Sequence, residues 1–257
     1  MFKLSMLDFK TWQHLIFPPA CRICGDIFTA KPTSQQHITT ECCAHCFKHI
    51  RIFDRHTCHR CGVPLAASLS PGPCGSCLQH APAQQQTQSL YVYHGAVREA
   101  LLAWKLQGQS AGLDWLLESA AKHLRTIFHP DDLLIPVPMP LPRMRRSGLH
   151  HSADLCLKIA ALTGCATDWQ ILRRTGNHTR QSALQGKARQ RNLRKAFSLA
   201  NDYPNRLKAQ QGKGQVWVID DILTTGATLR HACQAMLPIK QDVFAFSLAR
   251  VNHNQQE

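Results

Sequence analysis

Two adjacent carboxylates, Asp220 and Asp221, stand between a short apolar run and a loop rich in hydroxyl groups. The apolar run, residues 216–219, predicts a strand that is buried on both faces of a parallel sheet. The loop that follows contains Thr224, Thr225, Gly226, Ala227 and Thr228. Backbone N–H groups and the positive end of the helix dipole favour a phosphate where such a loop opens a helix. We therefore predict a phosphate site at this loop, with the two aspartates accepting hydrogen bonds from a ribose diol.

The order of strand, acid pair, loop and helix resembles the phosphoribosyl pyrophosphate (PRPP) signature of the type I phosphoribosyltransferases. The resemblance implies that Asp220 and Asp221 bind the ribose hydroxyls, that residues 224–228 hold the 5′-phosphate, and that Mg²⁺ accompanies PRPP. It also implies a loop after the first core strand that meets pyrophosphate, and Arg143 and Arg145 fit this loop by position. The structural alternative is an ordinary turn in which a threonine caps the helix, and that alternative does not require the paired carboxylates.

Eight of the twelve cysteines form four C-x-x-C pairs, a spacing that places two thiolates on one side of a tight turn. The pairs are Cys21/Cys24, Cys43/Cys46, Cys58/Cys61 and Cys74/Cys77. Eight thiolates suffice for two structural Zn²⁺ ions, each held by four cysteines in a closed site. A sequential arrangement, with the first two pairs on one zinc and the last two on the other, closes the shorter loops. An interleaved arrangement of the first pair with the third stays open.

The composition is that of a globular protein with an excess of positive charge. The chain has 257 residues, 44% apolar content and a formal net charge of +14, which favours polyanionic ligands such as phosphates or nucleic acid. We expect no membrane insertion, because no apolar run approaches the ~20 residues that span a bilayer. The start of the chain lacks a signal-peptide pattern, and cysteines at metal spacing suit a reducing compartment, so we expect a cytoplasmic protein.

Strands and helices alternate after the cysteine-rich region, which predicts an α/β fold with a parallel sheet and helices on both faces. The expected strands are residues 90–93, 133–137, 216–219 and 243–248, and the expected helices are residues 97–106, 113–128, 151–163 and 226–236. We expect three regions: residues 1–80 as an N-terminal helix and double zinc ribbon, residues 81–89 as a linker, and residues 90–257 as a phosphoribosyltransferase-like domain.

Along most of its length the chain resembles the ComF/GntX family, in which a double zinc ribbon precedes a phosphoribosyltransferase-like domain. The segments that carry the resemblance are residues 17–19, 93–95, 103–108, 135–138, 181–184, 189–197 and 248–250. One segment departs from the family pattern: Ser147-Gly148-Leu149-His150-His151 stands where Arg-Gly-Phe-Asn-Gln is common. The resemblance implies a role in the uptake and use of DNA or in nucleotide salvage, with other DNA-uptake proteins as partners.

A long basic stretch separates the predicted helix 151–163 from the motif strand. No acidic residue occurs from Trp169 to Asn201, a stretch that holds Arg173, Arg174, Arg180, Lys187, Arg189, Arg191, Arg194 and Lys195. These side chains could neutralise pyrophosphate, follow the backbone of single-stranded DNA, or form a solvated surface without a ligand.

Three functions are consistent with these features. The first is a phosphoribosyltransferase with an unidentified acceptor. The second is a non-catalytic protein that uses PRPP or a nucleotide as a regulatory ligand while it handles single-stranded DNA. The third is a zinc-ribbon interaction protein whose second domain is a scaffold.

Overall fold

The structure, a computed structural model, describes residues 18–28, 41–53, 56–68, 70, 72–175, 196–209 and 214–252. The chain divides into two compact units, one of Met1–Ile50 with His94–Ser119 and one of Arg51–Tyr93 with Ala120–Glu257. The predicted N-terminal helix lies outside the described residues, and the predicted domain limits stay a prediction. Among the helices that are described, none combines the length and the apolar character needed to cross a bilayer.

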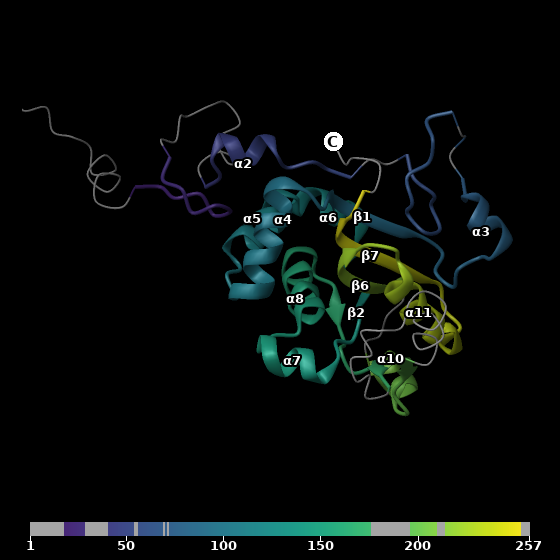
Figure 1. Ribbon diagram of the computed structural model, residues 1–257. Helices are drawn as coiled ribbons and strands as arrows, with labels where there is room; N and C mark the ends of the chain where they lie inside the picture. Colours follow the sequence, from purple (N-terminus) through teal and green to yellow (C-terminus); the bar gives the residue numbers. More distant parts are fainter. Residues whose placement is uncertain are drawn as a thin grey trace, which may run out of the picture. The chain divides into compact units, whose positions relative to one another are not determined.

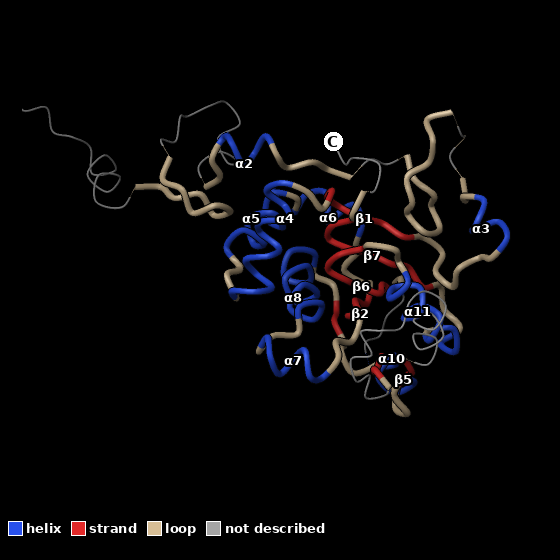
Figure 2. The backbone as a smooth tube through the Cα atoms, in the orientation of Figure 1, coloured by secondary structure: helices blue, strands red, loops and turns tan. Residues whose placement is uncertain are grey.

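The second unit contains a parallel sheet with the strand order β1–β7–β6–β2–β3 (Figure 2). The strands are β1 (Thr87–Val92), β2 (Leu133–Pro136), β3 (Ala166–Thr167), β6 (Val216–Leu223) and β7 (Val243–Arg250). All neighbouring strands pair in parallel, so the predicted parallel α/β fold is confirmed. Strand β1 begins inside the segment predicted to be a linker, because Thr87, Gln88 and Ser89 pair with residues of β7.

Two helices cover the central strands from opposite sides (Figure 1). Helix α8 (His151–Thr163) packs on β2 and β6, while α11 (Ala227–Ala235) packs on β6 and β7. The chain passes from β2 through α8 to β3 and from β6 through α11 to β7, so the two connections run in opposite directions across the sheet. Right-handed crossovers in opposite directions place their helices on opposite faces. Residues Leu133–Pro136 and the start of β6 are therefore buried on both faces.

A buried carboxylate at the start of the central strands fixes their alignment. Asp132 is only 3% exposed and accepts hydrogen bonds from the backbone N–H of Gln215 at 2.7 Å and from the indole N–H of Trp217 at 3.2 Å. Trp217 then meets the ring of Phe128 edge to face, with centroids 5.0 Å apart. These contacts hold β2 and β6 in register from their first residues. The register in turn sets how the residues at the carboxyl ends of the two strands are aligned.

The remaining described elements of the second unit are short. They are the helices α3 (Gly75–Gln79), α6 (Ala121–Ile127), α7 (Leu141–Ser147) and α10 (Tyr203–Ala209), the 3₁₀-helix η2 (Leu237–Ile239), and the antiparallel pair β4 (Leu172–Arg174) and β5 (Phe197–Leu199).

The first unit is helical in its described part. It contains α2 (Ala44–Lys48), α4 (Gly95–Leu102) with the π-helix η1 (Ala103–Gln107), and α5 (Ala111–Ser119). The single helix predicted for residues 113–128 is wrong, since α5 and α6 are separate and Ala120 between them has φ −96° and ψ 4°. The hydroxyl of Ser119 donates to the carbonyl of Leu116, and such local bonds compete with the helical ladder.

Candidate metal centres and ligand site

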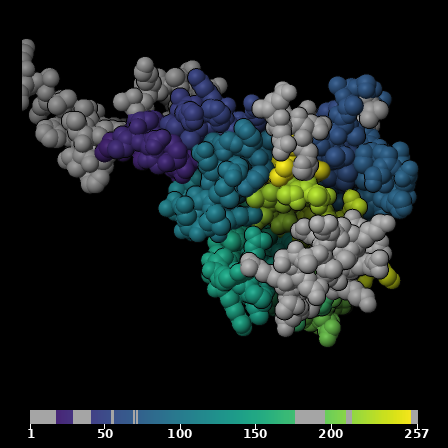
Figure 3. Space-filling model, viewed as in Figure 1, coloured from purple at the N-terminus to yellow at the C-terminus, as the bar shows by residue number. Residues whose placement is uncertain are grey.

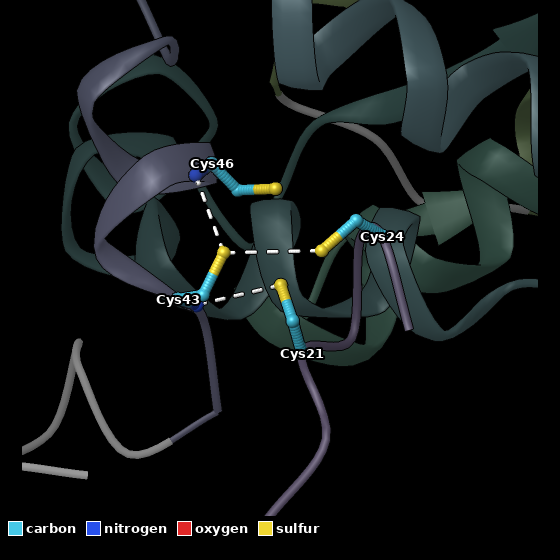
Figure 4. A group of neighbouring side chains, drawn as sticks. All are labelled: Cys21, Cys24, Cys43 and Cys46. Atoms are coloured by element: carbon cyan, nitrogen blue, oxygen red, sulfur yellow. Dashed lines mark hydrogen bonds between the residues drawn. The ribbon is translucent and has the colours of Figure 1, made fainter. Parts of the chain in front are cut away.

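The first cysteine cluster consists of Cys21, Cys24, Cys43 and Cys46, whose Sγ atoms point toward one another (Figure 4). All four sulfur atoms lie within 4.8 Å of one another, and those of Cys24 and Cys43 are 3.8 Å apart. A tetrahedral zinc with Zn–S bonds of about 2.3 Å separates its sulfur ligands by about 3.8 Å. The cluster therefore fits one zinc ion held by four thiolates.

Backbone groups around the first cluster favour the thiolate form of one of its four cysteines, Cys21. Gly25, with φ 78°, turns the chain so that its N–H donates to the carbonyl of Cys21 at 2.8 Å. Burial raises the pKa of Cys21, but hydrogen bonds from the backbone of Cys24 and Cys43 outweigh it and lower that pKa to about 6. A lowered pKa favours the thiolate, which is the form that binds zinc.

The second cluster repeats this construction with Cys58, Cys61, Cys74 and Cys77. Its Sγ atoms also lie within 4.8 Å of one another, with 3.8 Å between those of Cys61 and Cys74. The N–H of Cys74 donates to Sγ of Cys58 at 3.1 Å, and burial and backbone hydrogen bonds together leave the pKa of Cys58 lowered to about 7. The four pairs are thus arranged sequentially, and the two clusters fit two structural zinc ions.

Cys42 belongs to neither cluster. Its thiol is buried and lies 3.6 Å from the carbonyl oxygen of Cys43. Burial raises its pKa, so the thiol stays protonated and serves as a small apolar group.

The second cluster is attached to the sheet of its own unit. The N–H of Thr87, the first residue of β1, donates to the carbonyl of His59 at 2.9 Å. The hydroxyl of Thr87 donates to the carbonyl of Arg60 at 2.7 Å. At the end of β7, Nη1 of Arg250 donates to the carbonyl of Cys61 at 3.0 Å. The second ribbon therefore packs against the strands β1 and β7.

The acid pair lies in the last part of β6, where the strand emerges from the core. Asp220 and Asp221 are both partly exposed, in contrast to the buried residues before them. The carboxylate of Asp220 accepts a hydrogen bond from the hydroxyl of Ser152 at 3.2 Å and one from the N–H of Asp221 at 3.0 Å. The hydroxyl that orients Asp220 comes from the first turn of α8.

The predicted phosphate loop follows directly. Gly226 has φ 75° and forms the N-cap of α11, whose first residue is Ala227. Thr224 and Thr225 are exposed and Thr228 is partly exposed, while Leu229 packs into the core. The loop thus presents hydroxyl groups and the start of a helix beside the acid pair, and a left-handed glycine lets the backbone turn there.

The loop and acid pair lie at the point where the sheet topology reverses. The connections after the neighbouring strands β2 and β6 leave in opposite directions, and open α/β sheets bind ligands in the crevice outside such strand ends. Helix α7 follows β2 at this same edge and carries Arg143 and Arg145, both exposed. The segment around α7, teal-green in Figure 3, is at the surface of this view. The predicted basic residues Arg143 and Arg145 therefore follow the carboxyl end of β2, on the same side of the sheet as the carboxyl end of β6.

Two further side chains near the acid pair were not predicted as site residues. Burial lowers the pKa of the Arg174 guanidinium, while the negative charge of Asp220 acts in the opposite direction. Arg174 lies over the ring of Phe197, 5.2 Å from its centroid, and pairs with Phe197 in the antiparallel strands β4 and β5. The sequence placed it only within a long basic stretch. Residues 180–195 of that stretch lie outside the described residues.

The second is His150, in the segment that departs from the family pattern. Its Nδ1 accepts a hydrogen bond from the N–H of Ala153 at 3.1 Å and so caps α8, while its Nε2 lies 3.1 Å from the backbone nitrogen of Met139. A neutral imidazole accepts at one nitrogen only, and the cap takes that nitrogen. Burial lowers the pKa of His150, and the charge of Asp221 opposes this shift. His150 therefore joins the segment after β2 to the start of α8.

The fold and the cysteine clusters define a protein with a double zinc ribbon and a parallel α/β domain. Residues 12–78 match the family named double zinc ribbon domain. The chain is 31% identical over 200 residues to the DNA utilization protein YhgH of Shigella flexneri, covering 76% of this chain and 83% of that protein. For YhgH of Salmonella typhimurium the identity is 33% over 186 residues, covering 70% and 77%. For competence protein F of Haemophilus influenzae it is 27% over 218 residues, covering 81% and 90%. The chain belongs to the ComF/GntX family.

Proposed function

We propose that this chain acts in the uptake or use of DNA and that it binds PRPP at the acid pair and the loop of residues 224–228. The role in DNA use is supported by relatives named DNA utilization protein and competence protein F. The PRPP site is supported above all by one observation. A partly exposed pair of carboxylates and the open start of a helix follow each other at the strand end where the sheet topology reverses.

Each part of PRPP has a counterpart among these residues. Backbone N–H groups at the start of α11 and the hydroxyls of Thr224 and Thr225 suit the 5′-phosphate. The carboxylates of Asp220 and Asp221 suit the ribose diol, and the hydroxyl of Ser152 holds one of them in place. Arg143, Arg145 and Arg174 supply positive charge at the same sheet edge for the pyrophosphate. Mg²⁺ bound with the ligand would neutralise further pyrophosphate charge.

A titration of PRPP with Mg²⁺ into the full-length protein tests this site. Replacing both aspartates, as Asp220→Asn with Asp221→Asn, removes the charge that strengthens their hydrogen bonds to the diol. Such bonds contribute roughly 1.5–3 kcal/mol each, so the affinity should fall at least about tenfold. The matched control is Asp131→Asn, which changes an exposed carboxylate just before the amino-terminal end of β2. Equal calorimetric affinities in the double variant and the control would reject the assignment.

The reaction class remains a separate question, because binding PRPP does not require its transfer. A phosphoribosyltransferase would release pyrophosphate when an acceptor base is supplied with PRPP. A regulatory PRPP-binding protein would release none with any base. Pyrophosphate release measured over a panel of bases separates the two, with the double aspartate variant as the background.

Single-stranded DNA is a second proposed ligand, and the acid-free stretch from Trp169 to Asn201 favours it. Binding by phosphate neutralisation releases counterions, so log affinity falls linearly with log salt, by about 0.7 for each contact on a single strand. Replacing Arg189, Arg191, Arg194 and Lys195 by Ala should therefore flatten the slope by up to about 3. Fluorescence anisotropy with a labelled oligonucleotide measures it. An unchanged slope, or no binding at low salt, removes this role from the stretch.

A further inference from the structure

Trp169 is more exposed than any other tryptophan, tyrosine or phenylalanine in the described part of the chain. It is 54% exposed, whereas the described tryptophans Trp104, Trp115 and Trp217 are 1%, 4% and 1% exposed. Among the described residues no other ring and no cation stacks on its indole. The ring is therefore available to a ligand.

Trp169 lies in a short projection between two anchored stretches of backbone. Before it, Asp168 follows the end of β3, and its N–H donates to the carbonyl of Leu134 in β2 at 3.1 Å. After it, Ile171 is fully buried in the core. Only Trp169 and Gln170 stand between these anchors, so the backbone that carries the indole is fixed at both ends.

Side-chain hydrogen bonds hold the projection in place. Oδ1 of Asp168 accepts the N–H of Gln170 at 2.7 Å. Arg206 in α10 binds both neighbours of Trp169, because Nη1 donates to Oδ2 of Asp168 at 3.3 Å and Nη2 donates to Oε1 of Gln170. Nε of Arg206 also donates to Asp202 at 2.8 Å, which fixes the guanidinium itself. An aromatic ring on a fixed backbone loses little conformational freedom when it binds a flat partner.

Positive charge exceeds negative charge in the described segments next to Trp169, residues 168–175 and 196–209. They contain four basic and two acidic side chains: Arg173, Arg174, Arg206 and Lys208 against Asp168 and Asp202. Arg206 binds both acids, and within the described residues neither Arg173 nor Lys208 forms an ion pair. Arg173 is exposed on β4, and its charge acts on Asp202. A polyanion therefore meets net positive charge beside the projection.

An exposed indole beside positive charge is the combination that binds single-stranded nucleic acid, since aromatic rings stack on unpaired bases while cations neutralise phosphates. We propose that Trp169 is a stacking platform for an unpaired base of single-stranded DNA and that Arg173 neutralises a phosphate next to it. This inference rests on the DNA ligand of the proposed function and assigns it a contact. Because every base has a flat π-face, the platform should show little sequence preference.

Docking of another protein is the competing explanation, because tryptophan is enriched in protein interfaces. A specific protein interface buries about 800 Å² on each partner, and one projecting ring supplies a small share of that area. The net positive charge beside Trp169 favours a polyanion instead. A protein-docking role predicts that altering Trp169 leaves oligonucleotide binding unchanged, whereas a stacking role predicts weaker binding of single strands.

Fluorescence anisotropy with a labelled thymidine oligonucleotide and the full-length, zinc-loaded protein tests the proposal. Trp169→Ala should weaken binding about 5- to 150-fold, the range that follows from losing one stacked base. Trp169→Phe keeps a ring and should lose much less, while Trp169→Leu keeps apolar surface without a ring and should resemble Trp169→Ala. Leu157→Ala, at a 50% exposed position on α8, is the matched control and should bind like the wild type. Wild-type affinity in Trp169→Ala, or equal losses in the Phe and Leu variants, would overturn the platform.

Salt and an abasic oligomer separate stacking from charge. An indole neutralises no phosphate, so the plot of log affinity against log salt should keep its slope in Trp169→Ala and shift down in parallel. An abasic oligomer of the same length keeps the phosphates and lacks the bases, so the wild type and Trp169→Ala should bind it equally. A flattened slope, or the same loss of affinity on the abasic oligomer, would show that the substitution acts through charge or folding and would overturn the proposal.

Failure of the platform and failure of the proposed function give different results. Oligonucleotide binding that is unchanged in Trp169→Ala refutes only the platform. No oligonucleotide binding at low salt refutes the DNA ligand of the proposed function and the platform with it. PRPP affinity should be the same in Trp169→Ala and in the wild type, whereas the double aspartate variant should lose it. Loss of PRPP affinity in Trp169→Ala would place the indole in the PRPP crevice and overturn its assignment to DNA.

Discussion

The two cysteine clusters have the same ligands and the same geometry but different surroundings. Near the first cluster, Arg22 forms ion pairs of 2.8 Å with Glu41 and 2.7 Å with Glu118, whose side chains are each 54% exposed. Near the second, Arg250 is buried and bonds to the backbone of the cluster itself. Exposed ion pairs lie near the first cluster, and the strands β1 and β7 adjoin the second.

This difference predicts that two clusters with the same ligands contribute unequally to the stability of the fold. The second cluster lies against Thr87 of β1 and Arg250 of β7, so loss of its zinc would disturb these two strands of the sheet. The first cluster contacts elements of its own helical unit, where exposed ion pairs contribute little. The following predictions test this asymmetry, from the largest expected effect to the smallest.

Removing one ligand from each cluster gives the largest contrast. Cys58→Ser and Cys21→Ser should each reduce the zinc content from two ions to one. Structural zinc contributes on the order of 10 kcal/mol to folding in small zinc-binding peptides, so a fraction of this lost from the second unit is several kcal/mol. At about 2–4 °C per kcal/mol, Cys58→Ser should lower the unfolding midpoint of the sheet by roughly 10 °C. Cys21→Ser should leave that calorimetric transition in place, and equal shifts would remove the asymmetry.

Two glycines that directly follow a C-x-x-C pair, one in each cluster, offer a matched comparison. Gly25 and Gly62 both have positive φ, so alanine at either costs roughly 1–2 kcal/mol in backbone strain. A Cβ at Gly25 meets nothing within 4 Å, but at Gly62 it would lie 3.2 Å from Nη1 of Arg250 and 3.2 Å from the carbonyl oxygen of Thr87. Gly62→Ala should therefore lose about 1–3 kcal/mol more than Gly25→Ala. Urea unfolding measures both, and equal losses would show that the second ribbon packs loosely on the sheet.

The two arginines provide the third contrast. Arg250→Ala leaves the carbonyl of Cys61 without this donor in a partly buried setting, which should cost about 1–3 kcal/mol. Arg22→Ala breaks exposed ion pairs and should cost about 0.2–1 kcal/mol, with less effect at high salt. Chemical denaturation at low and high salt distinguishes the two. A larger loss for Arg22→Ala would reverse the comparison.

The smallest expected effect is a change in how stability depends on pH, and it comes from His150 near the acid pair. Burial lowers the pKa of His150 below its ordinary value of about 6.5, so the unfolded chain takes up a proton at a higher pH than the folded chain. The stability due to neutral His150 is complete above about pH 6.5 and is lost as the pH falls through the lower folded pKa. His150→Asn keeps a capping oxygen for α8 and should remove this part of the pH dependence. Urea midpoints from pH 5 to pH 8 that run parallel in the two proteins would contradict it.

Much of the fold could be predicted because the relevant patterns are local. Residues 216–219 are continuously apolar, and the strand they predicted is the first half of β6. The predicted helix 151–163 corresponds to α8, since its apolar residues recur at helical spacing and Gly164 ends it with φ 83°. The break at Ala120 was missed because no proline or glycine marks it. Just before the break the hydroxyl of Ser119 bonds to the carbonyl of Leu116, a contact that no sequence pattern predicts.

The candidate sites divide in the same way. Cysteine spacing and the adjacent acids are visible in short stretches of sequence, so both cysteine clusters and the loop at the start of α11 were predictable, while phosphate binding at that loop stays a prediction. Ser152, Arg174 and His150 reach the acid pair only because α8, β4 and the segment after β2 converge on one sheet edge. No periodicity records such a meeting. The basic residues 180–195 lie outside the described part, and their role stays a prediction.

The sequence by itself determined the chemistry: eight thiolates at metal spacing, two carboxylates beside a hydroxyl-rich loop, and strands that alternate with helices. The tertiary structure decided which groups meet. It joined the cysteine pairs sequentially and set the second cluster against the end of β7. The reason is physical: spacing along the chain controls contacts within a few residues, whereas contacts between distant segments depend on how the sheet is ordered and packed.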